Sequence, residues 1–164
     1  MTRRCAEQDV EVVMSGHDAF HPDLPDDQRK PLRSRLHHIR ADAVDGETAQ
    51  TGGMRRFAAI SGQATGSERI WMGETRVAPG TASDNHHHGE SETAIYVVSG
   101  RPAFVFHDGD EEVRLEAAAG DYVFVPPYVP HREENPDPEQ EAVVVISRST
   151  QEAIVVNLPE LYAV

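Results

Sequence analysis

The chain has a single cysteine, Cys5, among its 164 residues, so no internal disulfide can form and nothing indicates an oxidising compartment. Long hydrophobic runs are also missing. No apolar segment approaches the roughly 18 residues of a membrane-spanning helix, and residues 1–16 contain two arginines but no apolar stretch typical of a signal peptide. We therefore predict a cytoplasmic protein that does not bind membranes.

Basic residues are scarce. Lysine and arginine number 15 against 28 acidic residues, which gives a formal net charge of -13. Such a charge repels nucleic acids and anionic lipid surfaces, so neither is an expected partner. The length suits one domain with a hydrophobic core rather than two. We expect the partner to be a small molecule.

Residues 1–35 differ in composition from the rest of the chain. The stretch HPDLPDDQRKP at 21–31 has three prolines and mixed charges without an apolar period. Such a stretch does not belong inside a compact core. We predict an irregular or disordered N-terminal arm over 1–35 and one domain over 36–164.

Short β-like runs follow the arm, each closed by glycine, proline or aspartate, and no stretch has a helical apolar period. This pattern predicts an all-β fold, an antiparallel β-sandwich or jelly-roll barrel. The expected strands lie within residues 36–44, 54–62, 69–77, 93–100, 102–107, 111–120, 121–127, 141–149 and 152–158.

Three consecutive histidines stand within GTASDNHHHGESETAIYVVSG at 80–100. Alternate residues of a strand share a face, so His86 and His88 point together and His87 points away. Two imidazoles on one face can hold one transition metal, with a third ligand from elsewhere. His131 offers it, because prolines at 126, 127 and 130 restrict the backbone just before it.

Two spaced patterns resemble the two motifs of small single-domain bacterial cupins, members of the RmlC-like cupin superfamily. The first is formed by Gly80, His86, His88, an acidic cluster and Gly100, and the second by Gly120, Pro126, Tyr128, His131 and Asn135. The resemblance implies a small β-barrel with one divalent transition-metal ion, Fe, Zn, Ni, Mn or Cu. Three alternatives are open for its ligands: His86, His88 and His131 alone, these with Glu92 added, or a different outcome in which His87 is a ligand or no metal binds.

Glu92 departs from the cupin pattern by one residue. Counting back from Gly100 places the motif's glutamate position at Thr93, whereas counting forward from His88 reaches Glu92. Glu92 as a ligand requires an irregularity such as a bulge. In a regular strand Thr93, Ile95 and Val97 share one face and Glu92 lies on the other. If Glu92 is no ligand but still reaches the pocket, it is the candidate general base.

Tyr128 is the second departure, because the motif normally has glycine there, and glycine permits unusual backbone angles. Two interpretations are open. The ring lines the pocket mouth and its hydroxyl orients a substrate, which makes Tyr128 a candidate catalytic residue, or Tyr128 is an ordinary packed or surface tyrosine.

These patterns favour a metal-dependent cupin enzyme that acts on a small organic molecule. Among its possible activities, that of a dioxygenase-type oxidoreductase is favoured most. The alternatives are a Zn- or Ni-dependent isomerase, cyclase or lyase, and a small-molecule-binding cupin without turnover. Exposed edge strands need cover, so we expect a homodimer.

Overall fold

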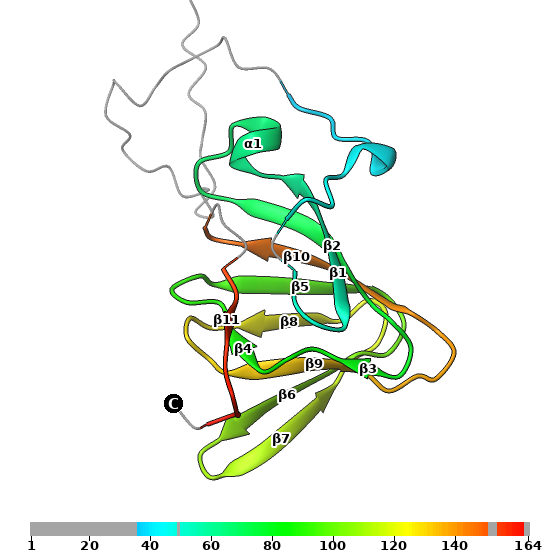
Figure 1. Ribbon diagram of the computed structural model, residues 1–164. Coiled ribbons are helices and arrows are strands. Elements are labelled where there is room, and N and C mark those ends of the chain that lie inside the picture. Colours follow the sequence, from blue (N-terminus) through cyan, green and yellow to red (C-terminus); the bar gives the residue numbers. More distant parts are fainter. Residues whose placement is uncertain (1–35, 49, 151–153, 163–164) are drawn as a thin grey trace, which may run out of the picture. The chain divides into compact units, whose positions relative to one another are not determined.

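Eleven strands and two short helices make up the part of the chain that this computed structural model describes, residues 36–48, 50–150 and 154–162 (Figure 1). The predicted arm over 1–35 lies outside the described residues. The strands are β1 (Met54–Ile60), β2 (Trp71–Val77), β3 (Thr81–Ala82), β4 (His86–His87), β5 (Thr93–Ser99), β6 (Ala103–Asp108), β7 (Glu111–Glu116), β8 (Tyr122–Val125), β9 (His131–Asn135), β10 (Ala142–Arg148) and β11 (Val156–Asn157).

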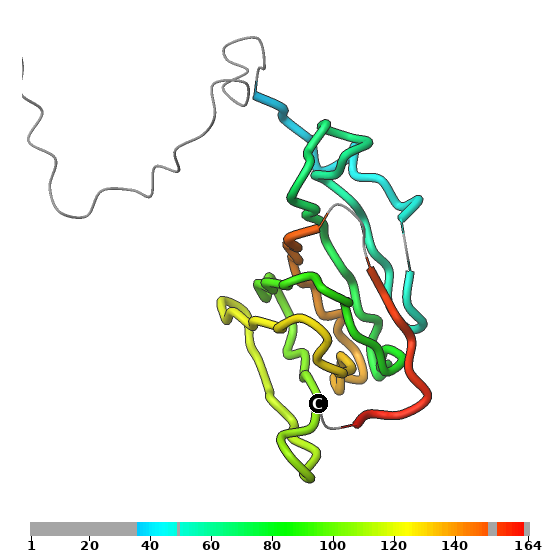
Figure 2. The backbone as a smooth tube through the Cα atoms, turned by 90° about the vertical axis from the view of Figure 1, so that its left-hand side faces the viewer, coloured from blue at the N-terminus to red at the C-terminus, as the bar shows by residue number. Residues whose placement is uncertain are grey.

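The strands form two antiparallel sheets. One has the order β1-β2-β10-β5-β8, and the other has the order β11-β4-β9-β6-β7, with β3 also paired to β9. Strands far apart in sequence are neighbours, as where the C-terminal β11, red in Figure 2, pairs with β4. This is the all-β jelly-roll sandwich that the sequence predicted.

Strict alternation of side chains builds the core between the sheets. In β10 the buried residues Ala142, Val144 and Ile146 alternate with partly exposed ones, and β5 buries Ile95 and Val97 in the same way. One face of each of these two strands therefore points inward. At one end of this pair of strands the inward side chains are the buried polar residues Thr93 and Arg148, and Thr93 contacts His88 of the candidate site.

Three predictions about elements need correction. No strand spans 36–44: a 3-10 helix, η1 (Ala41–Ala43), lies there instead. The short helix α1 (Gly62–Thr65) follows β1, because Ser61 accepts a hydrogen bond from the Ala64 amide and starts the turn. The list of expected strands also lacked β3 and β9, and it gave no separate strand at β4, although the alternation of His86 and His88 assumed extended chain there. No helix in the described part of the chain is long and apolar enough to cross a membrane.

Candidate metal centre

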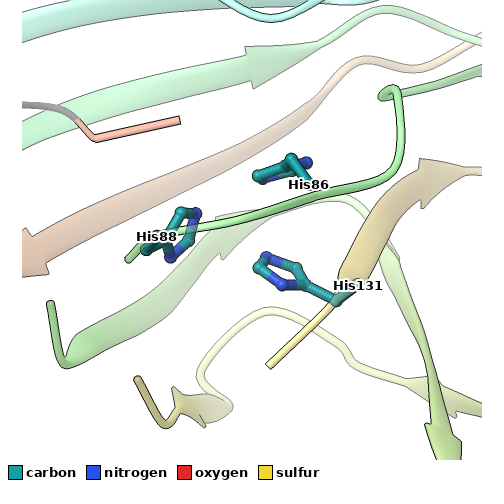
Figure 3. Close-up of side chains that lie close together, drawn as sticks. All are labelled: His86, His88 and His131. Atoms are coloured by element: carbon teal, nitrogen blue, oxygen red, sulfur yellow. The ribbon is translucent and has the colours of Figure 1, made fainter. Parts of the chain in front are cut away.

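His86, His88 and His131 come together between the two sheets, and Figure 3 shows their rings turned toward one another. The pairing of β4 with β9 sets His86 opposite His131. The ring centroids of these two lie 4.5 Å apart, and those of His88 and His131 lie 4.8 Å apart. One ligand atom from each ring lies within 4.8 Å of the other two. The structure thus brings together the three histidines that the sequence selected.

The hydrogen bonds made by Nδ1 of each ring decide that Nε2 is the nitrogen facing the space between the three rings. His86 Nδ1 donates to the Asp84 carbonyl at 2.8 Å, and His131 Nδ1 donates to the Val129 carbonyl at 3.0 Å. A carbonyl only accepts, so each Nδ1 carries the proton and each Nε2 keeps its lone pair. His88 Nδ1 lies 2.8 Å from Thr93 Oγ1. Such outer partners orient metal-binding imidazoles in many sites.

All three rings are buried, and no described residue makes a hydrogen bond to any of their Nε2 atoms. Burial lowers the pKa of His131 to about 4, and it also lowers the pKa of His88, with the positive charge of Arg148 adding to the effect. Both rings are therefore neutral near pH 7, the state that binds a metal ion. Buried nitrogens without partners and a neutral donor set fit a divalent transition metal.

The structure does not bring Glu92 to these histidines. From Thr93 to Val97, β5 pairs with β10 without a shift in register, and its one irregularity lies farther on, between Val97 and Ser99. Thr93 is buried and Glu92 is exposed on the outer face. The turn before β5 has the Ser91 amide bonded to the His88 carbonyl at 3.1 Å, and Thr93 pairs with Arg148 of β10. The bulge that a Glu92 ligand requires is absent from this stretch. Exposure on the outer face likewise removes the reason to assign Glu92 a catalytic role.

Tyr128 adopts φ 62°, and among the described residues it is the one non-glycine side chain with a positive φ. The turn thus keeps the left-handed conformation that glycine would favour at this motif position. The Tyr128 amide donates to the Gly89 carbonyl at 2.8 Å, which ties the two motifs together. Tyr128 is 55% exposed, and its ring centroid lies 5.9 Å from that of His87, outside the three-histidine group. This placement favours the surface interpretation over a catalytic one.

Sequence reasoning missed a set of buried charged side chains near the histidines. Glu133 of β9 is 2% exposed, and its Oε2 lies 3.9 Å from His86 Nε2. Arg56 of β1 and Arg148 of β10 are also buried, and burial lowers the pKa of Arg148 to about 10. The signal for Glu133 was its place two residues after His131, which puts both on one face of any strand.

An apolar pocket of about 280 Å³ adjoins the centre. His131 lies on its wall, so the pocket leads to one of the three imidazoles. The other side chains come from β6, β7, β8 and the turn after β8, and include Phe104, Phe106, Leu115, Val123 and Val129. A small molecule with an apolar body fits such a lining.

Residues 73–147 match the family model for the cupin domain. The chain contains a cupin domain. No curated protein sequence matches it. The cupin resemblance of the two motifs is therefore confirmed, and the match runs from β2 to β10.

Solved structures support the same fold. One similar structure is that of oxalate decarboxylase from Bacillus subtilis, a protein with Mn(II) centres. It has a TM-score of 0.59 and 25% identity, and the match covers 68% of this chain. The polyketide cyclase RemF from Streptomyces resistomycificus has a TM-score of 0.57 at 22% identity, covering 77% of this chain and 86% of that one. Oxalate oxidase has a TM-score of 0.58 at 21% identity, covering 70% and 59%. This chain spans only 30% of the oxalate decarboxylase chain.

Proposed function

We propose that this cupin domain binds one divalent transition-metal ion through His86, His88 and His131 and uses it to convert a small organic molecule. The observation that carries the proposal is the set of three buried Nε2 atoms that share one space and have no hydrogen-bond partner among the described residues. A bound ion would supply open coordination positions for oxygen donors, as a Lewis acid or, if it is Fe(II), for reaction with dioxygen.

The pocket beside His131 would bind the apolar part of the substrate and exclude water from it. Its lining is mainly hydrocarbon, with His107 and His131 as the polar members, so it selects for aromatic or aliphatic surface rather than for a small dianion. A molecule held there places one end beside the histidines.

Arg148 offers a second recognition element. Its Nε and Nη2 are buried and have no hydrogen-bond acceptor within the described part of the chain, while Nη1 donates to the Ile154 carbonyl at 3.3 Å. Two adjacent donors of a guanidinium match an anionic pair of oxygens. We therefore propose a substrate with an apolar body and an anionic oxygen group.

Dioxygenase-type oxidation is the chemistry we favour. Glu92, the predicted general base, and Tyr128, whose hydroxyl was predicted to orient a substrate, are both exposed, which disfavours isomerisation or cyclisation by acid–base catalysis through them. Redox-neutral chemistry is the second candidate, because Glu133 places a buried carboxylate 3.9 Å from His86. A binding protein without turnover is the third.

Two measurements test the proposal. Elemental analysis of protein purified without added metal should find close to one equivalent of a transition metal, and a His86→Ala/His131→Ala variant should have lost it. Negligible metal in both would overturn the proposal. Oxygen uptake is then screened over diketones, catechols and flavonoids. Turnover without oxygen uptake would favour the redox-neutral candidate, and a rise in melting temperature without turnover would favour the binding protein.

We also propose a homodimer. The edge strand β8 and its neighbour β5 expose the aromatic and aliphatic residues Tyr96, Val98, Tyr122 and Phe124 on the outer face. Tyr96 and Tyr122 are paired across the strands with ring centroids 4.9 Å apart, and Tyr122 is 81% exposed. An apolar patch on an edge strand is the kind of surface that a second copy covers.

A further inference from the structure

Strand β9 directs a carboxylate toward the three histidines. His131 and Glu133 are two residues apart in β9, and both are buried while Arg132 between them is half-buried on the other face. In the neighbouring strand β6, Phe106 pairs with His131 and Phe104 pairs with Glu133. Both Phe104 and Phe106 line the pocket, so this face of β9 looks onto the pocket and the metal centre.

Glu133 lacks the partners that a buried carboxylate needs. It is 2% exposed, and neither Oε1 nor Oε2 accepts a hydrogen bond within the described part of the chain. The guanidinium groups of Arg56 and Arg148 act on Glu133 through their charge but do not donate hydrogen bonds to it. An ionised carboxylate left in this state is costly unless it is paired or bound to a metal ion.

No other acidic side chain can take its place. Glu133 is the one buried carboxylate among the described residues. The inward position of β5 that leads into the centre is Thr93, whose Oγ1 lies 2.8 Å from His88 Nδ1, and Glu92 faces outward. A carboxylate ligand in this centre therefore has to come from β9.

The distance between Glu133 and His86 also fits two ligands of one metal ion. Two donor atoms bound to one ion at about 2.1 Å lie roughly 3 Å apart at a right angle and roughly 4 Å apart when opposite each other. Glu133 Oε2 and His86 Nε2 are 3.9 Å apart, within this range. Carboxylate oxygen added to imidazole nitrogen shifts the preference of a site toward Fe(II) and Mn(II).

We propose that Glu133 is the fourth ligand of the metal centre, contributed by β9 rather than by β5. This inference rests on the proposed metal binding by the three histidines. It reassigns the role that residue spacing had offered to Glu92, and it makes His131 and Glu133 a pair of ligands on one strand face. Thr93 then serves as the hydrogen-bond partner that orients His88.

Manganese binding tests the inference without any substrate. The full-length chain is freed of metal with a chelator, and free Mn(II) is measured by electron paramagnetic resonance during titration of the wild type, Glu133→Gln and Glu92→Gln. We expect Glu133→Gln to weaken Mn(II) binding at least about 10-fold, since even loss of a group that supports a ligand costs about that much. The matched control Glu92→Gln should bind as the wild type does.

The outcomes separate the two proposals. A wild type that binds neither Mn(II) nor any other transition metal overturns the proposed function itself. A wild type and Glu133→Gln variant that bind Mn(II) equally, with the same visible spectrum after loading with Co(II), overturn the Glu133 assignment and leave three-histidine binding in place. If Glu133→Gln does not fold, Glu133→Asp carries the test: its carboxylate is one methylene shorter, so weaker binding is expected and equal binding contradicts the assignment.

Discussion

His86 and His131 are paired residues of the neighbouring antiparallel strands β4 and β9, and their ring centroids lie 4.5 Å apart. Each ring donates from Nδ1 to the backbone carbonyl two residues before it, Asp84 for one and Val129 for the other. The two strands therefore fix both the separation of the rings and the nitrogen that each presents. Because the backbone holds these two rings in place, binding of the proposed metal ion would cost less entropy.

The hydroxyl of Thr93 should increase the affinity for a metal ion by orienting His88. Thr93→Val keeps the shape but removes the 2.8 Å contact between Oγ1 and His88 Nδ1. We expect the affinity for Mn(II) or Zn(II) to fall about 10- to 100-fold, measured by competition with a chelating dye. Thr75→Val is the matched control, since Thr75 is equally buried and its Oγ1 has no described hydrogen-bond partner. Equal affinities for the two variants would argue against an orienting role of Thr93.

The stability of the metal-free protein should fall as the pH decreases below about 6.5. Burial lowers the pKa of His131 from 6.5 to about 4, and it lowers the pKa of His88 as well. Below 6.5 the unfolded chain binds protons that the folded chain does not, so the free energy of unfolding decreases by up to about 1.4 kcal/mol per pH unit for each histidine. Above pH 6.5 these histidines are unprotonated in both the folded and the unfolded chain, so they take nothing from the free energy of unfolding.

Urea unfolding of metal-free protein at about pH 7, 6 and 5 measures this dependence. His131→Gln should reduce the slope with pH, whereas His38→Gln, a change at an exposed histidine, should leave it unaltered. The same slope for the wild type and His131→Gln would contradict the prediction.

The left-handed backbone at Tyr128 should lower the free energy of unfolding. At φ 62° an L side chain is strained, so Tyr128→Gly should unfold with a free energy about 1 kcal/mol higher than Tyr128→Ala. Comparing these two variants cancels the loss of the ring, because both lack it. Thermal and urea unfolding would check the difference, and an alanine variant as stable as the glycine variant would show that the turn is not strained.

Asn135 should be structural rather than catalytic. Its Nδ2 donates to the carbonyls of Val77, Ala78 and Gln140, and its Oδ1 accepts from the Asp137 amide. We expect Asn135→Ala to lower the free energy of unfolding by about 2–3 kcal/mol, since these buried backbone groups lose their partner. Metal affinity of the folded variant should be unchanged. A large loss of affinity at unchanged stability would instead place Asn135 in the site.

Dimerisation through β5 and β8 should depend on the exposed Tyr122. Tyr122→Glu puts a charge into the apolar patch, so the mass from light scattering should fall from that of a dimer to that of a monomer. Glu111→Gln, an exposed change on β7, is the control and should leave the mass unaltered. A wild-type chain that is already monomeric would contradict the prediction.

The sequence by itself determined much of the centre. Strand alternation selected His86 and His88 and removed His87, and the proline frame led to His131. The structure brings these three histidines together. The inferences rest on local geometry, the two-residue period of a strand and the fixed φ of proline. The positive φ at Tyr128 was not predicted, because tyrosine in place of glycine left the form of this turn open, and the structure shows it.

Only the tertiary structure decided which acidic residue comes near the metal centre. β9 has the sequence HREEN, which has no apolar alternation, and it is a strand because β4 and β6 pair with it. On its outer face Arg132 bonds to Glu134 and Glu112, so charge is tolerated there. The position of Glu92 likewise depended on the pairing of β5 with β10, which places Thr93 inward. Register is a property of paired strands, and one residue of slip exchanges the two faces, so no single strand could decide it.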